Sequence, residues 1–208
     1  MKSIVSMLRI ATVVAGVASA QIAFADAIPY STPGHVNTTT YSFTASSDGN
    51  LIAYFAGSTA GFHNQLGVLV NGVDTGIYGL DDHASSLGAS LDFGHVNSGD
   101  SLVFVLKVFD LGYNWYSNQS LNSDGLNHVY ATPYTATSVT GDGIPLGIIP
   151  PGTYVAFEDL PGGGDLNYHD ENFVFTNVSG AEVPDSGSTI CLFGTAILGL
   201  GFFRRRRA

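Results

Sequence analysis

The sequence Val96-Asn-Ser-Gly-Asp-Ser-Leu-Val-Phe-Val-Leu-Lys-Val-Phe109 decides the fold of this chain. Its first five residues have the composition of a tight turn, and residues 102–109 are the most apolar of the chain's short strand-like runs. Side chains alternate between the two faces of a strand. One face then carries Leu102, Phe104, Leu106 and Val108, and the other carries Val103, Val105, Lys107 and Phe109. A strand that is apolar on both faces is typical of a central position in a buried sheet.

The region around this stretch repeats a pattern of short apolar runs between turns. The runs are rich in Val, Phe, Tyr and Ile and are bounded by Gly, Asn, Asp and Pro, which is typical of strands. Val70-Asn71-Gly72-Val73 predicts a β-hairpin, because Asn-Gly suits the positive φ angles of a type I′ turn. The expected strands are residues 39–45, 51–55, 66–70, 76–78, 90–93, 102–109, 113–116, 128–132, 153–157 and 172–178.

This spacing of short strands and turns predicts an all-β fold, an antiparallel β-sandwich or jelly-roll-like domain over residues 26–180. No helix of useful length is expected between residues 26 and 182. Residues 133–151 are expected to form a long loop before the last two strands, and residues 182–189 a linker.

Acidic side chains dominate this domain. Between Asp26 and Glu182 there are 16 Asp and Glu residues and a single Lys or Arg, which is Lys107. Such a surface repels nucleic acids and anionic membranes, so neither is an expected partner, whereas divalent cations are favoured. Lys107 has two interpretations, the commoner being an edge residue that discourages strand pairing and the other a paired charge.

Carboxylates are most crowded in the loop between the last two expected strands. Ca²⁺ takes its oxygen ligands from carboxylates, amides and backbone carbonyls, and the glycines at 162–164 let the backbone wrap around an ion. Crowded carboxylates repel one another unless a cation is bound. The spacing is not that of an EF-hand. The candidate Ca²⁺ ligands are Glu158, Asp159, Asp165, Asn167 and Asp170, with Glu171 in the same loop.

Among these candidates, Asp159, Asp165 and Asp170 are the first choices. The alternative is a polar hairpin loop in which Asp side chains cap turns through local hydrogen bonds. Asp81-Asp82-His83 could supply additional ligands or bind a transition metal, and the commoner interpretation is a solvated loop.

The loop also resembles a known family signature. The elements that carry the resemblance are Phe157-Glu158-Asp159, Gly163-Gly164-Asp165 and Asn167-Tyr168-x-Asp170. They resemble the domain of unknown function 4114, which occurs in secreted and surface proteins of bacteria. That family commonly has Asp-Tyr-Asn-Asp, so His169 departs from its pattern. The resemblance spans residues 102–178 and implies no established activity.

The N-terminus has the features of a secretory signal peptide. Lys2 and Arg9 form its positive region, and residues 10–20 form its apolar region. Small residues suited to signal peptidase occupy Ala18-Ser19-Ala20 and Ala23-Phe24-Ala25. We favour cleavage after Ala25, which makes residues 1–25 the signal helix, with Ala20 as the alternative. The expected partners are therefore the Sec translocon and signal peptidase.

The C-terminus combines a short motif, an apolar helix and a basic cluster over residues 181–208. The motif is Val183-Pro184-Asp185-Ser186-Gly187, the apolar helix covers residues 188–203, and Arg204, Arg205, Arg206 and Arg207 follow. Arginines after an apolar run hold that end of a membrane anchor in the cytoplasm. At about 1.5 Å per residue, residues 190–203 reach about 21 Å of a hydrocarbon core about 30 Å thick. The anchor is therefore short for a permanent span.

This tail resembles the PEP-CTERM class of sorting signals, in the variant that begins Val-Pro-Asp-Ser-Gly. The resemblance implies handling by an exosortase, a membrane protease that cleaves near the motif. The protein would be anchored transiently in the inner membrane and then passed to the cell surface, the outer membrane or the extracellular matrix. The alternative is an ordinary single-pass anchor.

Further chemistry is sparse in the sequence. Tyr113, Trp115 and Tyr116 are candidates for stacking on a glycan, or else half-buried strand aromatics. The six His residues lack the helical pairing of a zinc protease, and no Gly-x-Ser-x-Gly elbow occurs.

We therefore expect that the protein is not an enzyme but an exported protein of the cell surface or extracellular matrix. Its sandwich is expected to be stabilised by Ca²⁺ and to serve exopolysaccharide or biofilm functions. The alternatives are a carbohydrate-binding module, with extracellular polysaccharide as its partner, and, ranked last, a secreted hydrolase.

Overall fold

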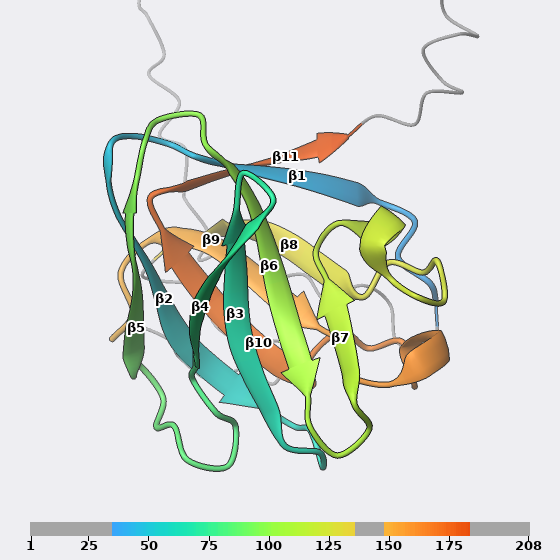
Figure 1. Cartoon of the computed structure of the whole chain (residues 1–208). Helices are drawn as coiled ribbons and strands as arrows, with labels where there is room; N and C mark the ends of the chain where they lie inside the picture. The colour runs from blue at the N-terminus through green and yellow to red at the C-terminus, as the bar shows by residue number, and fades with distance from the viewer. Residues whose placement is uncertain (1–34, 136–147, 184–208) are drawn as a thin grey trace, which may run out of the picture.

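Two antiparallel sheets pack face to face in the computed structural model, which describes residues 35–135 and 148–183 (Figure 1). The fold is therefore the all-β sandwich that the sequence predicts. The strands are β1 (Thr40–Ala45), β2 (Gly49–Ser58), β3 (Asn64–Val70), β4 (Val73–Gly79), β5 (Ser90–Val96), β6 (Ser101–Val108), β7 (Tyr113–Tyr116), β8 (Val129–Tyr134), β9 (Gly152–Phe157), β10 (Glu171–Thr176) and β11 (Val178–Val183). Two short 3₁₀ helices, η1 (Gln119–Leu121) and η2 (Pro161–Gly163), lie in loops.

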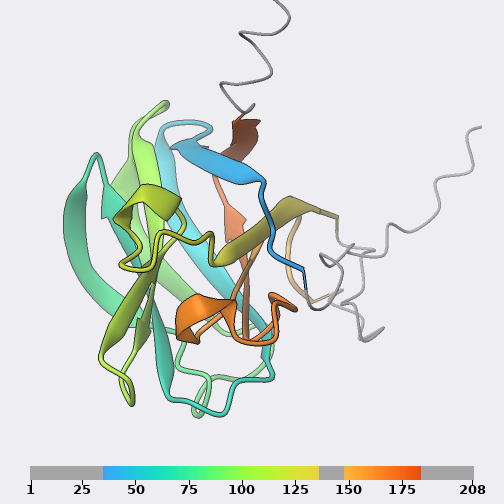
Figure 2. The same cartoon turned by 90° about the vertical axis from the view of Figure 1, so that its right-hand side faces the viewer.

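The larger sheet has the order β11-β1-β6-β3-β4, with β7 also paired to β6, and the smaller sheet has the order β5-β2-β10-β9-β8. Figure 2 shows the two layers from the side, with η1 and η2 near one another at the periphery. Within the described parts of the chain, no helix is long and apolar enough to cross a membrane. The expected signal helix at 1–25 and the expected membrane helix at 188–203 lie outside the described residues.

β6 is the central strand of the larger sheet, and its inner face forms the middle of the core. Leu102, Phe104, Leu106 and Val108 are at most 2% exposed, as their alternation predicts. The Phe104 ring lies 4.8 Å from that of Phe43 on β1 and stacks at 3.8 Å on that of Phe175 on β10. These three rings therefore join the two sheets.

Lys107 does not lie at a sheet edge. Its strand, β6, pairs with β3 on one side and with β1 and β7 on the other, so the expectation of an edge position is wrong. The Lys107 ammonium lies 5.3 Å from the ring centroid of Tyr78 and 5.0 Å from that of Phe109. Attraction between a cation and the faces of these rings explains its place on the outer face of an apolar strand.

Both predicted turns are present. Val70 and Val73 pair across the β3–β4 hairpin, and the two residues between them, Asn71 and Gly72, have φ angles of 51° and 80°. Before β6, the backbone N–H of Asp100 donates to the Asn97 carbonyl at 3.0 Å, and the Asp100 carboxylate accepts from the Asn97 N–H at 2.7 Å. The turn sequences therefore fix the starts of β4 and β6.

The last strand, β11, is missing from the sequence prediction. It pairs with β1 along all six residues, from Thr40 opposite Val183 to Ala45 opposite Val178, and takes the folded domain past the expected boundary at residue 180. Its sequence, Val-Ser-Gly-Ala-Glu-Val, lacks apolar alternation, so only the pairing partner identifies it. The expected loop at 133–151 likewise starts too early, because β8 continues to Tyr134.

Candidate functional site: an acidic end of the sandwich

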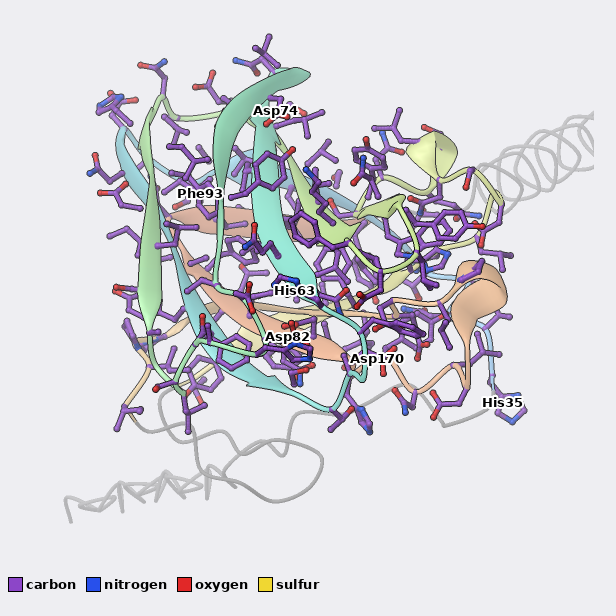
Figure 3. All side chains as sticks on the ribbon, turned by 60° about the horizontal axis from the view of Figure 1, so that its bottom comes forward. His35, His63, Asp74, Asp82, Phe93 and Asp170 are labelled. Carbon is purple, nitrogen blue, oxygen red and sulfur yellow. The ribbon has the colours of Figure 1, made fainter. Side chains whose placement is uncertain are left out.

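Most buried carboxylates gather at one end of the sandwich, where β3 and β10 begin and β9 ends. Figure 3 turns this end forward and labels His63, Asp82 and Asp170 there. The polar side chains form two groups. The loop group, on the β9–β10 connection, consists of Glu158, Asp165, Asn167 and Asp170. The inter-sheet group consists of Asn64, Asp82, Asp159 and Glu171.

Glycines shape the connection that carries the loop group. Gly162, Gly163 and Gly164 have φ angles of 78°, 82° and 51°, which favour glycine. A Cβ atom at Gly164 would lie 2.9 Å from Glu158 Oε2, so the backbone can approach this carboxylate only without a side chain. The predicted role of these glycines, to let the backbone wrap around an ion, stays a prediction.

Glu158 is the buried centre of the loop group, with 0% of its surface exposed. Its Oε1 accepts a hydrogen bond from the Tyr168 N–H, and the backbone of Asn167 also donates to this carboxylate. No donor group of another residue is hydrogen-bonded to its Oε2, but a side-chain hydrogen bond between the carboxyls of Glu158 and Asp170 acts to lower the pKa of Asp170. Burial, assisted by the charges of Asp170 and Asp165, raises the pKa of Glu158 to about 8.

The other members of the loop group differ in burial. Asp170 is half-buried, its Oδ2 accepts from the Asp159 N–H at 3.1 Å, and burial raises its pKa. Asp165 is exposed and accepts from the N–H and the Nδ2 of Asn167 at 3.3 and 2.7 Å. Asn167 Oδ1 accepts from the His169 N–H at 3.0 Å. Asp165 and Asn167 thus make the local hydrogen bonds expected of a polar hairpin loop in which side chains cap turns. Glu158 and Asp170 lie in a less polar environment.

The inter-sheet group is built around Asn64, the first residue of β3. Strand alternation places Asn64 on the same face as Leu66 and Val68, which lie in the core. Its backbone N–H donates to Asp82 Oδ1 at 2.8 Å, and its Nδ2 donates to Asp159 Oδ2 at 3.1 Å. Asn64 therefore ties the β4–β5 loop to the end of β9 across the two sheets.

Glu171, the first residue of β10, faces the core between the two sheets. It lies on the same face as Phe173 and Phe175, is 0% exposed, and has no hydrogen bond on either carboxylate oxygen. Burial, with smaller effects from Asp82 and Asp159, raises the pKa of Glu171 to about 10. Burial likewise raises the pKa of Asp159 to about 6.

Among the described residues, every buried side-chain nitrogen or oxygen that lacks a hydrogen bond is an oxygen. These oxygens are Asn64 Oδ1, Asp82 Oδ2, Glu158 Oε2, Glu171 Oε1 and Oε2, and Asn172 Oδ1. Residues 35–135 and 148–183 contain no group of three or more His, Cys, Asp and Glu side chains arranged to hold a metal ion. A cation at this end would need amide or backbone oxygens in addition, and Ca²⁺ accepts both.

The five predicted Ca²⁺ ligands thus lie at one end of the fold. Asp159 connects the two groups, because its carboxylate accepts from Asn64 Nδ2 of the other sheet and also interacts with the Asp170 side chain of the loop group. Asn64 carries no sequence signal as a ligand, since it is an ordinary first residue of a strand. The sequence indicates Asp82 as a ligand only weakly, through Asp81-Asp82-His83. It indicates Glu171 only as a member of the acidic loop.

The structure contradicts the predicted glycan-stacking role of Trp115. This residue is 0% exposed, its ring stacks 3.8 Å from that of His128, and its Nε1 donates to the Asp159 carbonyl at 2.7 Å. A ring in the core cannot stack on a sugar, so the prediction is wrong for Trp115. Tyr116 is half-buried, and Tyr113 is 37% exposed.

Comparison with known proteins identifies the tail. A family model described as the VPDSG-CTERM motif matches residues 182–207, which include the motif from Val183 to Gly187 and the arginines from 204 to 207. Neither a curated protein nor a solved structure matches the chain. The motif is a PEP-CTERM-like sorting signal, and it indicates an exported, cell-surface protein processed by an exosortase. The resemblance to the domain of unknown function 4114 stays a prediction.

Proposed function

We propose that this chain, which carries a VPDSG-CTERM sorting signal, is a non-enzymatic protein of the cell surface or extracellular matrix. Its sandwich is stabilised by Ca²⁺ bound at the loop group. The observation that carries the proposal is Glu158, a buried carboxylate with one oxygen that accepts from no donor group beside Asp165 and Asp170. Its environment penalises the ionised form unless a positive charge is supplied.

A role in exopolysaccharide or biofilm is part of this proposal. The sorting signal places the domain outside the cytoplasm, where Ca²⁺ is available to a site of modest affinity. The domain is also strongly acidic, and a divalent cation can join carboxylates of the protein to those of an acidic polysaccharide. Polysaccharide is therefore the proposed partner at the surface.

The test of the loop site is thermal unfolding of the full chain in mild detergent, with Ca²⁺ and with chelator. Ca²⁺ at about 100 times its dissociation constant is expected to raise the melting temperature by about 5 to 10 °C. Asp165→Asn is expected to weaken this effect, because it removes a charge from the loop group.

Asp92→Asn is the matched control for that variant. Asp92 is an exposed aspartate on β5 that accepts a local hydrogen bond from the Gly94 N–H at 2.8 Å and a cross-strand one from Asn50 Nδ2 at 2.7 Å. Its substitution should leave the Ca²⁺ effect unchanged. Equal melting temperatures of the wild-type chain in Ca²⁺ and chelator would contradict a stabilising ion.

A carbohydrate-binding module remains a second candidate because of the exposed rings at the β6–β7 hairpin. Phe109 is 41% exposed and Tyr113 is 37% exposed. Each ring stacks on a neighbour at 5.0 Å, Phe109 on His63 and Tyr113 on Trp115, so stacking on a sugar would use the opposite face. Tyr113→Ala is expected to abolish binding on a glycan array, whereas Tyr116→Ala, at a half-buried ring, should reduce it less. An array without signal for the wild-type chain would count against this candidate.

A further inference from the structure

The last strand of the sandwich and the sorting signal share residues. β11 ends at Val183, and the match to the VPDSG-CTERM motif begins at Glu182. Both residues are paired with β1, Glu182 opposite Tyr41 and Val183 opposite Thr40. Figure 1 shows β11 beside β1 at the margin of the sandwich. The linker expected at 182–189 therefore starts inside the folded sheet.

The folded domain lies close to the membrane for as long as the tail anchors it there. Residues 184–187, four in number, separate the end of β11 from the apolar helix expected at 188–203. Fully extended, four residues reach about 14 Å. A domain of about 140 residues has a radius of gyration of about 14 Å. With β11 in place, the domain is therefore held beside the motif that the exosortase must reach.

β11 is an edge strand that is held mainly at its start. It is the first strand in the order β11-β1-β6-β3-β4, so β1 is its neighbour on one side and its other side is a sheet edge. Val178 packs against the core, whereas Ser179 and Gly180 are exposed. Thr153 of the other sheet donates from its Oγ1 to the Val178 carbonyl at 3.1 Å. The described contacts of β11 with the core thus lie at the end remote from the motif.

A polar clamp fixes the point where β11 begins. Asn177 Oδ1 accepts from the hydroxyls of Ser46 and Ser47 at 2.9 and 2.8 Å and from the Ser47 N–H at 2.9 Å. Its Nδ2 donates to the Ser47 carbonyl at 3.0 Å. An opening that starts at the motif end is therefore expected to stop at Asn177. Release of the six residues of β11 makes the tether residues 178–187, which reach about 35 Å when extended.

We propose that β11 detaches from β1 before the exosortase processes the tail, so that strand pairing in the folded domain limits the rate of sorting. A segment in a folded sheet is cleaved through its locally opened state, because its backbone groups are otherwise bonded to the neighbouring strand. The exosortase would take up the released strand and the motif as one extended peptide. The proposal rests on the sorting signal and does not depend on bound Ca²⁺.

A disulfide between β11 and β1 tests the proposal. Ser42 and Ala181 lie directly opposite each other in the register, where Cα atoms are about 4.5–5.5 Å apart, as a disulfide requires. Outside the cytoplasm such a bond can form and persist. Ser42→Cys with Ala181→Cys leaves residues 182–207 unchanged. Cys191→Ala, made in every chain of this test, removes the single native Cys.

The measurement is the rate at which the full chain loses its tail in cells that carry the exosortase, followed by pulse-chase labelling and mass spectrometry of the product. We expect the β11–β1 cross-link to slow processing at least tenfold relative to the Cys191→Ala reference chain. Reductant added to the cells should restore the reference rate, because it frees β11 without changing the sequence.

Two further chains make the test specific to β11. Asn50→Cys with His95→Cys joins β2 to β5 at another exposed, directly opposed pair, and it should leave the rate unchanged. A ten-residue Gly-Ser linker between Ala181 and Glu182 of the β11–β1 cross-linked chain should restore processing. The flexible linker places the whole matched signal outside the locked strand.

Each result decides for or against strand release. Processing of the β11–β1 cross-linked chain at the reference rate would overturn the proposal, because the exosortase would then act with β11 in place. A cross-linked chain that stays unprocessed even with the linker would overturn it too, since the block would then lie in export or folding. A reference chain that keeps its tail would contradict use of the sorting signal and this proposal together. The Ca²⁺ melting experiment is independent of all these results.

Discussion

In the presence of chelator, the full chain is expected to be less stable at pH 8 than at pH 5. Burial raises the pKa of Asp159 to about 6, that of Glu158 to about 8 and that of Glu171 to about 10. The folded state therefore holds more protons than the unfolded state above the ordinary carboxyl range. Stability is full below that range and falls as pH rises through these values, by about 1.4 kcal/mol per pH unit for each proton held only in the folded state.

Ca²⁺ is expected to reverse this trend. Bound carboxylates must be ionised, so the ion is held more tightly as pH rises and adds most stability at pH 8. The measurement is chemical or thermal unfolding at pH 5 and pH 8, with and without Ca²⁺, at fixed ionic strength. A chelated chain that gains stability towards pH 8 would contradict the burial of these carboxyls.

Glu171→Gln is the internal control for the pH effect. Glutamine cannot titrate, so the variant in chelator should lose stability less steeply between pH 5 and pH 8 than the wild-type chain. Asp92→Asn changes an exposed aspartate and should leave the slope unchanged.

Phe104→Ala is expected to lower the free energy of unfolding by about 3–5 kcal/mol, because it removes a fully buried ring and leaves a cavity. Phe104 is 0% exposed and contacts Phe43 of its own sheet and Phe175 of the other. Since domains are stable by about 5–15 kcal/mol, this loss is a large share of the total. Urea unfolding followed by circular dichroism measures it.

Phe109→Ala makes the same change at the exposed end of the same segment. Its ring is 41% exposed and touches His63 and Lys107 at the surface, so the expected loss is about 1 kcal/mol or less. Equal losses in Phe104→Ala and Phe109→Ala would show that the ring stack between the sheets does not hold the sandwich together.

Local sequence patterns predicted the elements well where side-chain alternation and turn chemistry agree. Alternation in residues 102–108 identified the inner face of β6, and Asn71-Gly72 identified the β3–β4 hairpin, because both signals act between neighbours in the chain. β11 was missed for the opposite reason. Its residues have no apolar pattern of their own and become a strand by pairing with β1 at the other end of the domain.

The sequence by itself determined the sorting tail, the acidic character and the all-β class, since each depends on residue order or composition. Only the tertiary structure decided which buried polar side chains lie together. Asn64 and Asp159 are 95 residues apart and touch because β3 and β9 belong to sheets that face each other. Burial of Trp115 was decided in the same way, by His128 and Asp159 from other segments. The direction of a side chain across a sandwich depends on register and packing between sheets, which a local pattern does not contain.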